Sequence, residues 1–138
     1  MTNTETLRAQ LDLSADPIPV LTPGELGAQG DVLLIPVPAA KKGSWRDVPA
    51  EGLVIVAGTH DHMLIGDACW LPAGTRVTTE LTIGWVSTGS GGAHLLHVGR
   101  DGRLSGEHGT VQLDAGGVWE IRGQRETASE GSWRRVAD

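Results

Sequence analysis

Two histidines separated by a single residue, His60 and His62, are the clearest chemical signal in the sequence. In an extended strand, residues two apart project from the same face, with their Cα atoms about 6.5 Å apart. Imidazole is a common protein ligand for zinc, iron and nickel, and catalytic metal sites usually combine three protein ligands with one open position. We therefore expect this pair to bind a divalent metal ion (zinc, nickel or iron) together with a third ligand, and we expect no organic cofactor.

Three residues are candidates for the third ligand. His108 is the best remote candidate, because a glycine follows it and it opens a predicted hairpin. Asp67 lies at odd offsets from both histidines, so a bulge or turn at Gly66 is needed to direct its carboxylate toward them. Cys69 is a weaker candidate, since a lone cysteine also fits the role of a small buried hydrophobe. The alternative to a metal site is a His-x-His pair that forms only a polar face on a half-buried strand.

The stretch from His60 to Gly74 resembles the first motif of the cupin superfamily, in which two histidines, a glutamate and a turn glycine occur at similar spacings. This resemblance implies a small barrel, a bound metal and an enzyme that acts on a small molecule. The sequence departs from the pattern because Asp67 replaces the glutamate. It also lacks the second motif, since Trp119 stands where the histidine of that motif would be.

A second resemblance rests on four short motifs that occur in one order: Gly30-Asp-Val32, His60-x-His62, Glu107-His-Gly109 and Gln124-Arg-Glu126. Together they resemble a group of uncharacterised small bacterial β-proteins. The resemblance implies no particular activity. It retains His60, His62 and His108, and it therefore favours His108 over Asp67 as the partner of the histidine pair.

Short apolar runs separated by glycine-rich turns predict an all-β domain, either a small barrel or a jelly-roll-like sandwich. We expect strands near residues 31–37, 53–57, 63–71, 76–86, 93–99, 110–113 and 118–121. Asp101-Gly102 and Asp114–Gly117 are turn signals that predict two hairpins. The run Gly89-Ser-Gly-Gly92 is expected to interrupt the chain.

The chain, residues 1–138, is expected to form one domain with a peripheral N-terminal arm over residues 1–30. A short helix is expected between Thr2 and Leu13, before several prolines impose an extended path. Near the other end, Arg122, Gln124 and Glu126 alternate and would share one polar strand face. Such a face can recognise a partner or simply be solvated.

Composition excludes several classes of partner. The net charge is −6 and the only adjacent pair of lysines is Lys41-Lys42, so nucleic acid is not an expected partner. The sequence shows neither a secretion signal at its start nor an apolar run of about 18 residues, so we expect no membrane insertion and a cytoplasmic location. One cysteine cannot form an internal disulfide.

The sequence favours a binding or assembly module that docks onto another protein or onto itself, with or without a histidine-bound metal. A cupin-like metal-dependent enzyme is the alternative, and a metal-free protein whose histidines are a polar rim is the third reading. No nucleophile-base pair, phosphate-cradling loop or paired carboxylate motif decides whether the protein is an enzyme. A barrel with an open mouth lined by the histidines would favour the enzyme, and a filled interior would favour the module.

Overall fold

A computed structural model describes residues 3–12, 18–74, 81–104, 109–123, 125–127 and 133–135. The chain is mostly strand, as the glycine-rich alternating pattern predicts. The elements within the described residues are α1 (Asn3–Asp12), β1 (Val20–Leu21), β2 (Gly27–Gln29), β3 (Val32–Pro36), β4 (Arg46–Asp47), β5 (Leu53–Val56), β6 (Asp61–Pro72), β7 (Thr82–Val98), β8 (Val111–Leu113), β9 (Val118–Gly123), β10 (Arg125–Thr127) and β11 (Trp133–Arg135).

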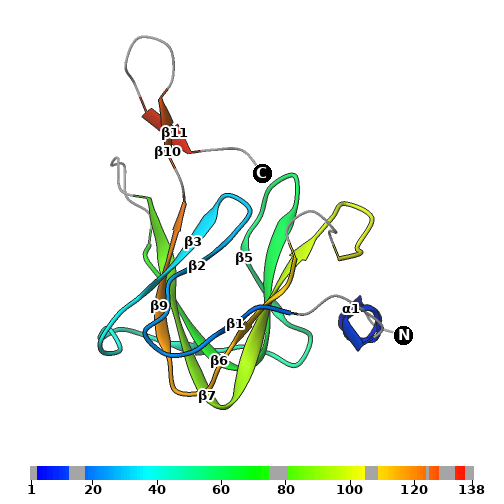
Figure 1. The fold of residues 1–138 in the computed structure, drawn as a ribbon, viewed down its shortest axis with the longest axis horizontal. Coiled ribbons are helices and arrows are strands. Elements are labelled where there is room, and N and C mark those ends of the chain that lie inside the picture. Colours follow the sequence, from blue (N-terminus) through cyan, green and yellow to red (C-terminus); the bar gives the residue numbers. More distant parts are fainter. Residues whose placement is uncertain are drawn as a thin grey trace.

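The two longest strands, β6 and β7, form an antiparallel pair that is the frame of the sheet. Along its other edge, β7 bonds first to β9 and then to β8. The sheet continues from β9 to β3 and β2, from β8 to β1, and from β6 to the short strands β4 and β5. It curls into a nearly closed barrel, which confirms the predicted fold class (Figure 1).

The Gly89–Gly92 run lies within a strand and does not end it. The pairing register jumps here, from Gly66 opposite Ala93 to Ala68 opposite Thr88, so β7 carries extra residues that bulge outward. The Asp67 carboxylate accepts a hydrogen bond of 3.0 Å from the Gly91 N–H, which anchors the bulge. The prediction of a chain break was therefore wrong, because glycines in a strand can also mark a bulge that bends it.

The prediction of a hairpin around Asp114–Gly117 was also wrong, although both of the predicted strands are present. β8 and β9 do not pair with each other; both pair with β7, on either side of its bulge. The Thr88 hydroxyl donates to the Asp114 carbonyl at 2.7 Å and accepts from the Gly117 N–H at 2.9 Å. The Asp114–Gly117 turn thus connects β8 and β9 across the bulge of β7. The turn at Asp101-Gly102 does join two paired segments, since Val98 bridges Leu104.

Large aliphatic side chains and two tryptophans fill the inside of the barrel. Trp119, Leu34, Leu64 and Leu95 are fully buried there, within one apolar cluster. A smaller cluster on the outside of β6 and β7 contains Leu7, Ile65 and Leu96, and here α1 covers the sheet. The helix predicted between Thr2 and Leu13 is therefore present and packed against the barrel (Figure 1).

The N-terminal segment contributes more to the fold than the predicted peripheral arm would. Its strand β1 pairs with β8 in parallel, and β2 pairs with β3. Leu21 and Gln29 are buried. Within the parts of the chain described above, no helix combines the length and the apolar character needed to cross a membrane.

Candidate functional site

The predicted histidine pair lies at one end of the barrel, where both imidazoles contact a third ring, that of His97. His62, near the start of β6, pairs with His97 across the β6–β7 hairpin. Their ring centroids are 4.7 Å apart, and those of His60 and His97 are also 4.7 Å apart. His60 lies just before β6 and is partly buried, whereas His62 and His97 are almost completely buried.

His62 is held by hydrogen bonds through both of its ring nitrogens. Its Nδ1 lies 2.9 Å from Oε1 of Gln29, and its Nε2 lies 3.1 Å from Oδ1 of Asp31. Gln29 ends β2, Asp31 lies in the turn between β2 and β3, and both are buried. These bonds connect β6 with the β2–β3 hairpin across the inside of the barrel.

The orientation of the Gln29 amide follows from its other contacts. Its Nε2 donates to the backbone carbonyls of Leu95, at 2.7 Å, and Gly109, at 3.0 Å. The Oε1 atom therefore faces His62 and can only accept, so Nδ1 of His62 carries a proton. Nε2 of His62 is engaged by the Asp31 carboxylate.

This arrangement bears on the metal hypothesis. Because Gln29 and Asp31 engage both ring nitrogens, His62 can bind an ion only if one of these two contacts is given up. The described residues contain no group of three or more His, Cys, Asp or Glu side chains that could hold a metal. His108 lies outside the described residues, so the complete ligand set of His60, His62 and His108 stays a prediction.

The structure does not bring the other candidate ligands to the histidines. Asp67 is exposed on the outside of the barrel, where it contacts the bulge of β7. The bulge next to Gly66 that the sequence called for is present, but it does not turn Asp67 inward. Cys69 is partly buried, and its Sγ donates to Oδ1 of Asp47 on β4 at 3.2 Å. Its pKa is raised, first by that hydrogen bond and then by burial and by the charges of Asp47 and Asp67.

Sequence reasoning missed Gln29, Asp31 and His97 as members of this cluster. Asp31 belongs to the Gly-Asp-Val motif, but nothing near it in sequence indicates a histidine partner. One signal for His97 is its spacing along the strand. It lies two residues after Leu95 and four after Ala93, so all three side chains point to the same, inner face of β7. The pairing of His97 with His62 comes from the register of β6 and β7, which this signal does not give.

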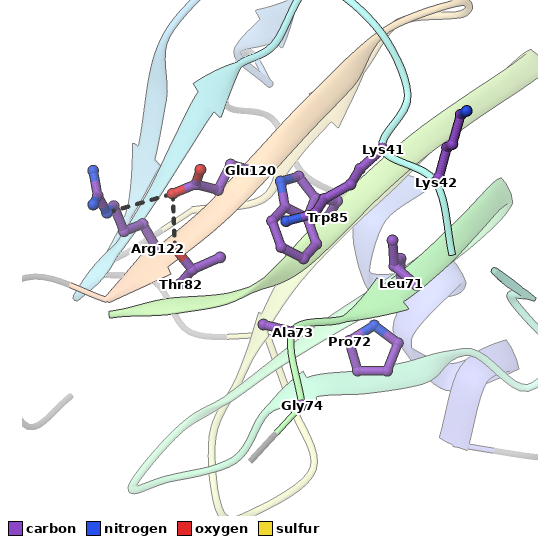
Figure 2. A pocket seen from close by; sticks show the side chains of 10 residues that line it. All are labelled: Lys41, Lys42, Leu71, Pro72, Ala73, Gly74, Thr82, Trp85, Glu120 and Arg122. Atoms are coloured by element: carbon purple, nitrogen blue, oxygen red, sulfur yellow. Dashed lines mark hydrogen bonds and ion pairs between the residues drawn. The ribbon is translucent and has the colours of Figure 1, made fainter. Parts of the chain in front are cut away.

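A second candidate site is a pocket on the outer face of the barrel, with a volume of about 430 Å³ (Figure 2). That volume falls in the range of small-molecule sites. The pocket is formed by the loop after β3, the end of β6, and the outward faces of β7 and β9. Its lining residues are Lys41, Lys42, Leu71, Pro72, Ala73, Gly74, Thr82, Trp85, Glu120 and Arg122.

The floor of the pocket is a row of side chains on neighbouring strands. Trp85 on β7 stands opposite Leu71 on β6 and opposite Glu120 on β9. Residues next to Glu120 in sequence, Trp119 and Ile121, point into the core and are fully buried. The alternation of β9 therefore forces Glu120 and Arg122 onto the outer face.

The polar groups at the β9 side of the pocket are linked to one another. The Glu120 carboxylate accepts a hydrogen bond of 3.1 Å from the Thr82 hydroxyl and pairs with Nε of Arg122 at 3.4 Å. Arg122 is about half exposed, and Glu120 is largely shielded. The guanidinium has five N–H donors, so Arg122 keeps further donors for a ligand while its Nε pairs with Glu120.

The opposite side of the pocket carries the two adjacent lysines. The Lys41 Nζ lies 4.0 Å above the centre of the Trp85 ring, in a cation–π contact. The loop that bears it is fixed, since the Trp45 indole N–H donates to the Lys41 carbonyl at 2.8 Å. Lys41 and Lys42 are exposed. The sequence contained this site only as an isolated lysine pair and an alternating polar strand.

The comparisons with known proteins add a family but no activity. No curated protein matches the chain, and no solved structure does either. One family model matches residues 28–124 of the 138-residue chain, which includes the histidine cluster and every residue that lines the outer pocket. The chain therefore belongs to the family described as a domain of unknown function (DUF8820).

Proposed function

We propose that this protein is a binding module and that the outer pocket takes a small anionic molecule. The observation that carries the proposal is the charge of the pocket: three cationic side chains, Lys41, Lys42 and Arg122, against one anionic side chain, Glu120. The whole chain, by contrast, has a net charge of −6. A local excess of positive charge on an acidic protein favours a small anion over a polyanion, which the rest of the surface repels.

The filled interior of the barrel supports binding over catalysis inside it. Trp119, Leu34 and Leu113 occupy the interior with no exposed surface, and His62 and His97 are buried beside them. A substrate would need an opening that reaches these groups. The outer pocket, in contrast, opens to solvent and combines an apolar floor with polar groups at both ends.

The remaining expectations from the sequence stay predictions. A protein partner, self-association and a cupin-like enzyme each have no specific contact among the described residues that favours them. A zinc, nickel or iron ion bound by the histidines also stays a prediction, and the hydrogen bonds of His62 oppose it.

Isothermal titration with inorganic phosphate tests the proposal at low ionic strength. We expect binding that weakens as salt is added, because exposed charges are screened within about 10 Å at 0.1 M salt. Lys42→Glu should weaken binding by about fivefold or more, since it removes one attraction and adds a repulsion, each worth up to about 1 kcal/mol.

Arg103→Glu is the matched control, because it makes the same charge change at an exposed residue that does not line the pocket. It should alter phosphate affinity much less than Lys42→Glu. Absence of phosphate binding, or equal losses in the two variants, would remove the pocket as an anion site.

A further inference from the structure

The outer pocket is more specific than a patch of positive charge, because an aromatic ring lies at its centre. Trp85 projects between the Arg122–Glu120 pair and the two lysines in Figure 2. Its neighbours across the strands are the apolar Leu71 on one side and the carboxylate of Glu120 on the other. A ligand that enters the pocket must therefore pass over or against the indole.

The face of Trp85 is covered by a group that can leave. The Lys41 ammonium lies 4.0 Å from the ring centre, but Lys41 is exposed, and the hydrogen bond from Trp45 holds its backbone carbonyl and not its side chain. Cation–π contacts at exposed sites are weak, because water solvates the ammonium almost as well. An aromatic ligand ring gains both apolar burial and stacking on the same face.

The charges of the pocket are unequal at its two sides. Arg122 is partly neutralised by Glu120, whereas Lys41 and Lys42 make no ion pair in the structure as described. The lysine side is thus the better place for an anionic group. The Thr82, Glu120 and Arg122 side offers donors and an acceptor to polar atoms at the far edge of a ring.

We infer that the ligand is a small aromatic anion, with a phosphate or carboxylate group next to a planar ring. The ring stacks on Trp85 in place of the Lys41 ammonium, and that ammonium turns with Lys42 to the anionic group. The Lys41 ammonium therefore occupies the ring face only until the ligand displaces it. This inference rests on the proposed function, because it requires that the pocket bind anions.

The test compares three probes on the full chain: phenyl phosphate, inorganic phosphate and phenol. We expect phenyl phosphate to bind about two- to tenfold more tightly than inorganic phosphate, which is the range that one aromatic contact contributes, and phenol to bind most weakly. Stacking should also shift the phenyl proton resonances of bound phenyl phosphate upfield. Trp85→Leu should abolish the preference for phenyl phosphate over inorganic phosphate.

The outcomes separate the two proposals. If inorganic phosphate binds but phenyl phosphate binds no better, the ring inference is wrong and the anion site stands. If neither phosphate binds, the proposed function fails. A preference that persists in Trp85→Leu, or phenyl resonances without an upfield shift in the parent, would place the ring elsewhere. Trp85→Phe should keep most of the preference, which provides a second variant should the leucine change unfold the protein.

Discussion

The Nε2 atom of His62 lies 3.1 Å from the Oδ1 atom of Asp31, and both side chains are buried at one end of the barrel. Gln29 completes the arrangement on the other ring nitrogen. The histidine that is the most prominent candidate ligand in the sequence is therefore a cross-link between β6 and the β2–β3 hairpin.

This cross-link predicts a large loss of stability when His62 is removed. His62→Leu leaves the Asp31 carboxylate and the Gln29 oxygen buried without their partner, and breaking a buried pair in this way costs about 3–5 kcal/mol. Urea unfolding measures the change in the free energy of unfolding. His60→Leu is the control, because His60 is partly buried and its Nδ1 makes no hydrogen bond in the described structure. It should cost about 1 kcal/mol or less, and equal costs would contradict the cross-link.

The same bonds predict how the protein responds to metals. An ion that binds only the folded state raises the melting temperature. Because both nitrogens of His62 face oxygen atoms of Gln29 and Asp31, we expect added zinc or nickel to shift the melting temperatures of the parent and of His62→Leu equally. A rise confined to the parent would support the metal site of His60, His62 and His108 and would show that the ion displaces Gln29 or Asp31.

His94 projects from the outer face of β7, opposite to the face that carries His97. We expect it to lower the stability of the protein in mild acid. Burial, and then the charge of Arg8 on α1, lower the pKa of His94 below its usual 6.5. The unfolded chain therefore takes up a proton at a higher pH than the folded chain, so this contribution to stability is lost as the pH falls below about 6.5.

His94→Gln should remove that part of the pH dependence. Relative to the parent, the free energy of unfolding of this variant should rise as the pH falls from about 7.5 to 5. It should stay constant above about pH 7.5. Arg8→Gln should have the same sign and a smaller effect, because burial is the larger cause. An unchanged pH profile in His94→Gln would show that the folded protein takes up the proton normally.

Cys69 is expected to react slowly with thiol reagents. Its hydrogen bond to Asp47 raises the pKa of the thiol, so less of the reactive thiolate is present near neutral pH. Asp47→Asn should speed alkylation by iodoacetamide, and Asp67→Asn should do so less, since its charge is the smallest of the causes. Rates measured in denaturant should be the same for both variants, and a parent rate as fast as that of Asp47→Asn in the folded state would contradict the prediction.

The sequence by itself determined the fold class and the position of most strands. The apolar runs at β3 and β6 and the tight turn at Gly102 are local signals, because strand propensity and turn conformation depend on a few adjacent residues. The family match agrees with the expectation of an uncharacterised group, and the helix α1 begins and ends within one residue of its prediction. His60 and His62 were also identified from their spacing alone.

Only the tertiary structure decided which side chains meet. Gln29 and Asp31 are about thirty positions from His62, and the curvature of the sheet brings them together across the barrel. The outer pocket depends in the same way on the loop at Lys41 folding over Trp85 and on β9 pairing with β7 in place of β8. Glycines that bend a strand and glycines that end it look alike in sequence, since the choice is made by the neighbouring strand that the bulge contacts.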